Sequence, residues 1–437
     1  MKKTYLIIFL ILPAALCAQN NKNWLIKTGK LFDSETAQFK TGLDILVKGN
    51  SIEDVKPDAD ITADERKQYT LIDLSRYTVL PGLIDAHTHL LYREGNSGNG
   101  RNTSTLALER HLTMDGDAYR ALYGAARAKG YLEQGITSVQ DLGNSGIYGD
   151  IALRKAIGDG LIPGPNISCA GPGLAAAGAQ LPGLLTGDQQ LVDREYRIVS
   201  GVDDAVQAVR EHVNQTVNVI KVYADNRPNR TLLSVEEIRA IVTEAHRYHI
   251  RVTAHATVDE SIKNAVLAGV DGIEHGYNVS DSTLMLMAKH KVVLVPTDGD
   301  NEGAIKLFSS RITDTAALNA QVKRYRKVYM DRLQRAVKYG VTIAYGSDDY
   351  AKSKSLFGEP SKHNLIGYNE GGIAIPQVLQ IATTNSALQL NWGKYLGILK
   401  KGYMPDIIAV DNSIEKDIHA IMNVRFVMKG GVVYVNK

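Results

Sequence analysis

Two histidines that are one residue apart, His87 and His89, close the apolar run "PGLIDAHTHL". Residues i and i+2 of an extended strand project to the same face, so the two imidazoles are expected to lie together. Neutral imidazole nitrogens are common ligands of divalent metal ions. An H-x-H pair also arises by chance. The pair therefore predicts half of a metal site, and other parts of the chain must supply the rest.

Three further candidate ligands stand at or near the ends of short β-branched runs. His255 ends "RVTAHA", His275 lies near the end of "GIEHG", and Asp348 ends "VTIAYGSD". Taken singly, each histidine is more typical of a structural residue, and the aspartate of a turn. Their shared position at the ends of strand-like runs favours a common site.

Lys221 is the most informative candidate. It lies in "NVIKVYA", where apolar residues on both faces predict a fully buried strand. Lysine is rarely buried without a partner, and a structural ion pair is the simpler interpretation. Burial also favours the neutral amine, which can take up carbon dioxide to form a carbamate. A carbamate has two oxygens and could bridge two metal ions.

Eight strand-like runs alternate with helical patterns between residues 81 and 396, and this alternation predicts a (β/α)8 barrel. Active sites of such barrels lie at the C-terminal ends of the strands, where the candidate ligands fall. One connecting helix is predicted from a capping box of Ser234 and Glu237, and another ends at Gly269. The runs are "GLIDAHTHL", "GITSVQDL", "NISCAG", "NVIKVYA", "RVTAHA", "GIEHG", "VVLVPT" and "VTIAYGSD".

Both ends of the chain outside the barrel are rich in short strands. Gly49-Asn50 and Gly430-Gly431 each separate two apolar segments, as hairpin turns do. We therefore expect residues 19–80 and 397–437 to form one small β domain, which the chain leaves and re-enters.

Residues 1–18 have two lysines, an apolar stretch and a small residue before Gln19, which predicts a cleaved secretory signal and a periplasmic protein. A lipid anchor at Cys17 is disfavoured, because Leu16 replaces the small residue expected before such a cysteine. No later stretch is long and apolar enough to span a membrane.

Cleavage after Ala18 leaves 48 basic residues against 47 acidic ones. The near-neutral charge argues against nucleic-acid binding by bulk positive charge. Only Cys169 remains after cleavage, so no internal disulfide can form. A homo-oligomer is left open.

The motifs together resemble the amidohydrolase superfamily, in particular its imidazolonepropionase-like and Xaa-Pro dipeptidase-like branch. The matching segments span nearly the whole chain after residue 18, and the ligand motifs keep the family's order. These segments are "VLPGLIDAHTHL", "VIKVYAD", "LSVEEIRAIVTEAHRYHIRVTAHA", "AVLAGVDGIEHG", "TIAYGSD" and "LGILKKGYMPDIIAVD".

The resemblance implies a distorted (β/α)8 TIM barrel with a small β-sandwich domain made from both chain ends. It also implies two divalent metal ions, usually zinc. His87 and His89 would hold the more buried ion, and His255 and His275 the second. Lys221 would be a carboxylated bridge, and Asp348 both ligand and general base.

The implied activity is hydrolysis of an amide bond by a metal-bridging hydroxide, and we expect a dipeptide or an N-acyl amino acid as substrate. Tyr223 and Tyr92 are candidates for contacting it, against a simple packing role. Arg93 or Arg101 in the following loop could bind a carboxylate. Two alternatives remain: a cyclic amidase or deaminase of the imidazolonepropionase type, and a non-catalytic binding protein on the same scaffold.

Overall fold

The computed structural model describes residues 22–93, 111–227, 229–309, 311–349 and 357–437. The predicted signal segment 1–18 and Arg101 lie outside these residues. Export and a role for Arg101 therefore stay predictions.

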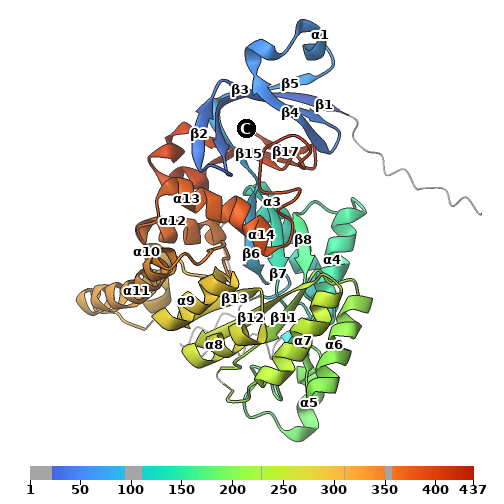
Figure 1. Ribbon diagram of the computed structural model, residues 1–437, viewed down its shortest axis with the longest axis vertical. Helices are drawn as coiled ribbons and strands as arrows, with labels where there is room; N and C mark the ends of the chain where they lie inside the picture. The colour runs from blue at the N-terminus through green and yellow to red at the C-terminus, as the bar shows by residue number, and fades with distance from the viewer. Residues whose placement is uncertain (1–21, 94–110, 228, 310, 350–356) are drawn as a thin grey trace, which may run out of the picture.

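The two ends of the described chain form a single eight-stranded sheet (Figure 1). The strands follow the order β17-β16-β15-β5-β1-β3-β4, and β2 pairs with β1. Both predicted hairpin turns are confirmed, because Gly49-Asn50 joins β3 to β4 and Gly430-Gly431 joins β16 to β17. The bounds are β1 (Asn23–Asp33), β2 (Gln38–Thr41), β3 (Leu43–Lys48), β4 (Ser51–Pro57), β5 (Thr70–Pro81), β15 (Ile407–Asp411), β16 (Val424–Lys429) and β17 (Val432–Asn436).

This sheet has its own apolar cluster, to which both chain ends contribute. Ile26 and Ile45 come from the N-terminal part, and Ile407 and Phe426 from the C-terminal part. Burial of such side chains is worth about 2 kcal/mol each, so the two ends stabilise each other. The β-sandwich form predicted for this unit stays a prediction.

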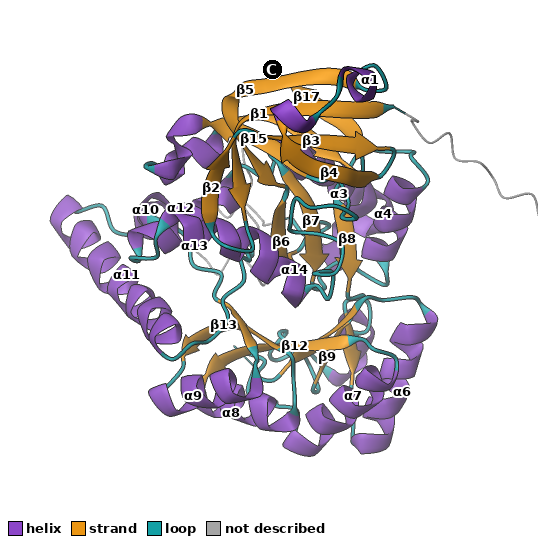
Figure 2. Cartoon of the chain, turned by 45° about the horizontal axis from the view of Figure 1, so that its top comes forward, coloured by secondary structure: helices purple, strands orange, loops and turns teal. Residues whose placement is uncertain are grey.

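The middle of the chain forms two sheets of parallel strands, with helices on their outer side (Figure 2). One sheet has the order β6-β7-β8 and the other β10-β9-β11-β12-β13-β14. The bounds are β6 (Leu83–Thr88), β7 (Ile136–Asp141), β8 (Asn166–Cys169), β9 (Gly173–Ala175), β10 (Tyr196–Ile198), β11 (Val219–Tyr223), β12 (Arg251–Val258), β13 (Gly272–Asn278) and β14 (Val293–Val295).

Seven of the eight predicted runs are strands. The eighth pairs only as an isolated bridge, between Ile343 and Leu294, and is therefore less regular than predicted. Strands β9 and β10 were not predicted, since each has only three residues. Parallel strands alternating with helices constitute a TIM-barrel-like α/β fold.

Helices connect these strands, and the two that the sequence predicts are confirmed. In α7, Ser234 and Glu237 form the capping box, and α8 ends at Gly269, which has a φ of +100°. The principal helices are α3 (Gly116–Glu133), α4 (Gly149–Gly158), α6 (Val202–Asn214), α7 (Val235–Arg247), α8 (Asp259–Ala268), α9 (Asp281–His290), α10 (Asn301–Ser309), α11 (Thr315–Lys338), α12 (His363–Glu370), α13 (Ile375–Gln380) and α14 (Ser386–Gln389).

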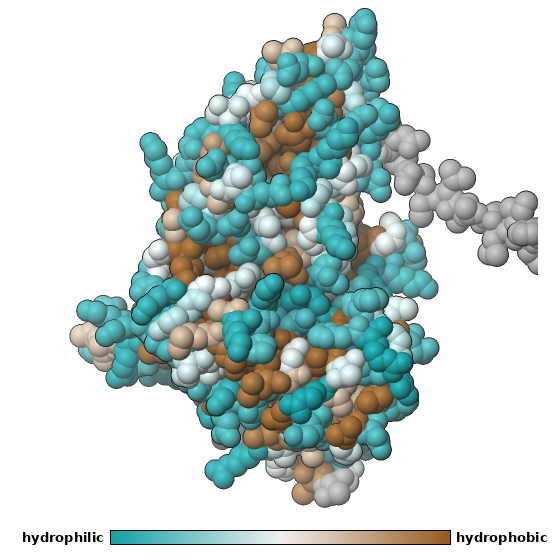
Figure 3. All heavy atoms as spheres, viewed as in Figure 1, coloured by the Kyte–Doolittle hydropathy of each residue, from teal (hydrophilic) through white to brown (hydrophobic). Residues whose placement is uncertain are grey.

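The surface is mixed in polarity. On the face seen in Figure 3, hydrophobic side chains form separate patches among hydrophilic ones. Among the described residues, no helix combines the length and the apolar character that a membrane crossing requires.

Candidate metal centre

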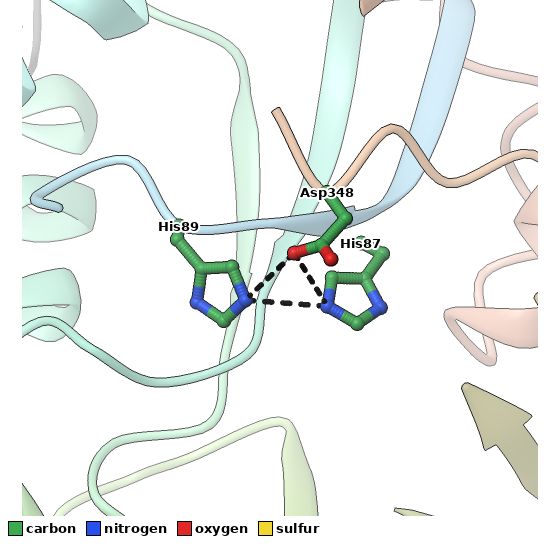
Figure 4. A group of neighbouring side chains, drawn as sticks. All are labelled: His87, His89 and Asp348. Atoms are coloured by element: carbon green, nitrogen blue, oxygen red, sulfur yellow. Dashed lines mark hydrogen bonds and ion pairs between the residues drawn. The ribbon is translucent and has the colours of Figure 1, made fainter. Parts of the chain in front are cut away.

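Three predicted ligands converge at one end of the parallel strands. Asp348 Oδ1 lies 3.4 Å from His87 Nε2 and 3.3 Å from His89 Nε2, and the two nitrogens are 3.2 Å apart (Figure 4). His87 is in β6, His89 follows that strand, and Asp348 follows the eighth run. The sequence prediction that these residues meet is therefore correct.

Backbone contacts bring Asp348 to the histidines. Asp348 N donates to His87 O at 2.9 Å, and Ala86 N donates to Tyr345 O at 2.7 Å. Gly346 permits this approach, because a Cβ there would lie 2.7 Å from His87 Cβ and 2.3 Å from Val295 Cγ1. Any larger residue at 346 would push the two segments apart.

Asp85 reinforces the same junction. Its Oδ1 accepts from Ser347 N at 2.9 Å and from His87 N at 3.2 Å. The side chain is fully buried, and burial raises its pKa to about 7 although these donors oppose the shift. Asp85 thus positions the backbone on both sides of the candidate centre.

His275 and His255 extend the group. The His275 ring lies 5.0 Å from the His87 ring and 4.7 Å from the His255 ring. His275 Nδ1 is also 3.9 Å from Asp348 Oδ2. The four histidines and Asp348 therefore border one continuous space, as the order of the motifs predicts.

Lys221 lies in the same strand layer and is 1% exposed. Among the described residues it has no hydrogen bond or ion pair, and its nearest recorded partner is the Tyr223 ring, 5.4 Å from Nζ. Burial lowers the pKa of Lys221, although the negative charges of Glu274 and Asp348 oppose this effect. Within the part of the chain that the structure describes, the structural ion pair considered for Lys221 is not formed.

Three non-glycine residues at the centre have a left-handed backbone conformation. His275, Thr297 and Asp348 have φ angles of +69°, +56° and +50°. Non-glycine residues seldom adopt this left-handed conformation, which persists where the surrounding structure enforces it, often at functional sites.

A buried carboxylate that the sequence did not single out supports His87. Glu274 Oε2 lies 2.6 Å from His87 Nδ1, and Thr253 donates to the other oxygen of Glu274. His89 is oriented similarly, with its Nδ1 2.8 Å from Gly143 O. In both histidines the contact at Nδ1 leaves Nε2 facing Asp348.

The other two histidines have polar neighbours as well. Thr297 Oγ1 lies 2.8 Å from His275 Nδ1. Asp225 Oδ1 lies 3.6 Å from His255 Nε2, and Asp225 itself accepts from the backbone and side chain of Thr257. Partners of this kind orient ligand histidines and adjust their basicity.

The electrostatics favour an ionised Asp348. Burial and Lys221 would lower the pKa of His87, but Asp348 and Glu274 raise it overall. Burial alone would raise the pKa of Asp348, but His87 and the hydrogen-bonding contacts of both histidines hold it well below its usual range. Burial lowers the pKa of His89, His255 and His275. Such a donor set matches the needs of a divalent metal ion such as zinc.

Two buried polar atoms also fit a bound metal. Among the described residues, Asp348 Oδ1 and His255 Nε2 have ion-pair contacts at 3.3 Å or longer but no hydrogen bond of good geometry. Unsatisfied buried polar atoms are costly and usually indicate a missing ligand, ion or water. Together with His87 and His89, which lie within 4.8 Å of Asp348, they fit a metal-binding role.

The two tyrosines named as substrate contacts lie in a separate apolar cluster. Tyr223 packs 5.3 Å from the His255 ring and 5.4 Å from the Tyr196 ring. Tyr92 is 4% exposed in the same cluster. Tyr223 thus borders the centre, Tyr92 packs behind it, and substrate contact by either remains a prediction.

A second group of possible ligands is already engaged elsewhere. Asp300 caps Gly303 N of α10 and lies 2.6 Å from His363 Nδ1, and Glu302 pairs with Lys306. These contacts account for the group without a metal ion.

A parallel α/β fold with histidines and an aspartate meeting at the strand ends is an arrangement that could hold a metal ion, as metal-dependent hydrolases do. The model of the Amidohydrolase family matches residues 78–434. The chain belongs to this family, and it is a hydrolytic enzyme acting on carbon–nitrogen bonds.

Individual relatives are similar over most of their length. Ochratoxinase from Aspergillus niger is 29% identical over 409 residues, covering 85% of this chain and 79% of the relative. Imidazolonepropionase from Brevibacillus brevis is 25% identical over 387 residues, covering 85% and 84%. A Xaa-Pro dipeptidase structure with bound methionine has a TM-score of 0.80 at 27% identity, covering 95% of this chain and all of that one.

Proposed function

We propose that the protein hydrolyses the amide bond of dipeptides or N-acyl amino acids. The observation that carries this proposal is the contact of Asp348 Oδ1 with Nε2 of both His87 and His89. The names of the relatives support the same class, because they include a dipeptidase and ochratoxinase.

The residues that would hold two divalent ions, most suitably zinc, are those of the candidate centre: His87, His89, Lys221, His255, His275 and Asp348. Two bound ions would supply hydroxide at neutral pH and polarise the scissile carbonyl. Lys221 would contribute as a carbamate, formed when its neutral amine bonds to the carbon of carbon dioxide and releases a proton. Its burial without a partner supports this modification.

Asp348 is proposed as the general base. Its lowered pKa keeps the carboxylate ionised, so it can accept the proton of the attacking water and pass it to the departing nitrogen. The histidine contacts and the strained backbone fix the carboxylate, which limits the reorganisation required during the reaction.

A pocket of about 690 Å3 adjoins Asp225, the neighbour of His255. Arg227 and Arg230 line this pocket and are exposed. Asn264 of α8 also lines it. Guanidinium groups pair well with carboxylates. The pocket therefore supports a substrate that carries a free carboxylate, as dipeptides and N-acyl amino acids do.

We also propose that the two parallel sheets are parts of one distorted (β/α)8 barrel over residues 81–396. Asn218 N donates to Cys169 O at 2.8 Å between β8 and β11, and Ala86 N contacts Tyr345 O between β6 and the eighth run. Residues 19–80 and 397–437 would form the β-sandwich domain, and residues 1–18 an export signal. Sequencing the N-terminus of the exported protein tests cleavage after Ala18.

The activity is tested by screening dipeptides and N-acyl amino acids with the zinc-loaded protein and measuring free amino acid and ammonia. We expect amino acid release, and a large loss of rate when the substrate carboxylate is esterified. Ammonia without amino acid release would instead favour the deaminase alternative. Failure of every amide, with binding retained, would favour the non-catalytic alternative.

A further inference from the structure

We propose that the phenol of Tyr277 donates a hydrogen bond to the carbonyl oxygen of the bound substrate. This inference rests on the proposed amide hydrolysis and adds a residue that contacts the substrate. Tyr277 lies in β13, two residues after His275, and neither composition nor motif singled it out.

The hydroxyl of Tyr277 lies beside the candidate centre. It is 3.2 Å from His275 Nδ1, and the two rings are 5.2 Å apart. Asp348 Oδ2 lies 3.9 Å from the same nitrogen. The Tyr277 hydroxyl and Asp348 Oδ2 thus both lie within 4 Å of His275 Nδ1, on the segment that would border a substrate attacked by water at Asp348.

Tyr277 is also the accessible member of this group. It is 40% exposed, whereas His275 is 5% exposed. A buried candidate ligand and a partly exposed tyrosine at one strand end are arranged as expected of residues that meet an incoming substrate.

The hydrogen bonds around His275 leave the phenol proton of Tyr277 able to bind another acceptor. His275 Nε2 makes no hydrogen bond to any described residue and is the nitrogen open to a metal ion, so the ring proton would lie on Nδ1. That proton points to Thr297 Oγ1 at 2.8 Å, and Nδ1 then cannot accept from Tyr277. The Thr297 hydroxyl also interacts with that of Tyr277 and can donate to it.

Arg332 holds the ring of Tyr277 in place. Its guanidinium carbon lies 5.2 Å from the ring centroid, and the side chain is 1% exposed. Arg332 Nη2 donates to Asp298 and, at 3.3 Å, to Pro296 O, whereas Nε and Nη1 have no hydrogen-bond partner among the described residues. The guanidinium therefore packs against the face of the Tyr277 ring, and this contact restricts the position of the phenol hydroxyl.

A fixed donor aimed at a developing oxyanion stabilises the transition state more than the ground state. Tyr277 would keep its proton throughout, because it only strengthens a hydrogen bond as negative charge grows on the carbonyl oxygen. Its removal should therefore weaken binding of a tetrahedral analogue more than binding of the amino acid product.

The test compares Tyr277→Phe with Tyr434→Phe, which removes a hydroxyl from a partly exposed tyrosine in β17 of the terminal sheet. Zinc content is measured by elemental analysis. Calorimetry measures binding of an N-acyl amino acid analogue whose scissile carbonyl is replaced by a methylphosphonate, and of the free amino acid. For Tyr277→Phe we expect the zinc content to be unchanged. Affinity for the phosphonate and kcat should each fall about 100-fold, whereas product affinity should stay within about threefold of wild type.

Equal phosphonate affinity in wild type and Tyr277→Phe, with wild type active, would overturn the inference and leave the proposed function standing. Equal weakening of phosphonate and product would also overturn it, because Tyr277 would then serve ground-state binding. A wild-type protein that neither hydrolyses the amides nor binds the phosphonate would overturn the proposed function and this inference with it.

Discussion

His87 Nδ1 and Glu274 Oε2 lie 2.6 Å apart, and neither side chain is more than 1% exposed. The carboxylate, in β13 of one parallel sheet, reaches the imidazole in β6 of the other and fixes the ring so that Nε2 faces Asp348. A buried charge is tolerated here because Thr253 and His87 both contact it.

Replacing Glu274 by Gln keeps the size of the side chain but removes its charge. We expect metal affinity to fall about 10- to 100-fold, because the partner of a ligand histidine controls its orientation and basicity. Competition with a fluorescent zinc chelator measures this change. Glu236→Gln, on α7, is the control, and an affinity equal to that of the control would contradict the role of Glu274.

Thr297→Val should act on His275 in the same way. Valine has nearly the same shape but cannot accept from Nδ1, so the ring loses its nearest polar partner. We expect zinc affinity to fall about tenfold or more, whereas Thr297→Ser should retain it. Equal zinc binding by the valine and serine variants would show that the contact does not orient the ligand.

Asp348→Asn tests the general base. The variant keeps the shape of the side chain but cannot accept a proton, so kcat should fall about 1000-fold. Progress curves of amino acid release provide the measurement, and Asp331→Asn on the exposed face of α11 is the control. Activity close to that of the control would exclude Asp348 as the base.

The buried Lys362 should make the free energy of unfolding depend on pH. It is fully buried, its Nζ donates to Gln134 Oε1 at 2.8 Å and to two backbone carbonyls, and burial lowers its pKa to about 7. Between pH 7 and 10.5 the unfolded chain therefore binds more protons than the folded chain. The free energy of unfolding should rise with pH across this window, by up to about 5 kcal/mol from this residue.

Denaturant unfolding at several pH values measures this dependence. Lys362→Met should lose the rise, although it is less stable overall because Gln134 and the carbonyls lose their donor. The exposed Lys306→Met serves as control. Parallel pH profiles for wild type and Lys362→Met would contradict the prediction.

The sequence indicates which candidate ligands lie close together, because their positions depend on local patterns. His87, His255 and His275 each end or nearly end a β-branched run, and parallel strands carry such residues to one edge of a sheet. Lys221 stands out because a charged residue interrupts an apolar run. The same signal was present at Glu274, which follows Ile273 in the run containing His275 and was overlooked.

The supporting contacts could not be predicted in this way. Asp225 reaches His255 because their strands are neighbours, and Thr297 reaches His275 from a left-handed backbone conformation. Neither contact has a characteristic spacing in the sequence. Tyr277 lies two residues after His275, so a regular strand would place both on one face, but positive φ angles at His275 and Gly276 make this segment irregular. The eighth run is irregular because Gly346 and Asp348 are fitted against β6 rather than extended beside β14.

Zinc titration of chelator-stripped protein tests the central claim most directly. Amide hydrolysis is followed as zinc is added in steps, and bound zinc is counted by elemental analysis. We predict that stripped protein is inactive, that activity reaches a plateau at about two ions per chain, and that Asp348→Asn stays inactive throughout. Full activity in stripped protein that contains no metal would contradict the account.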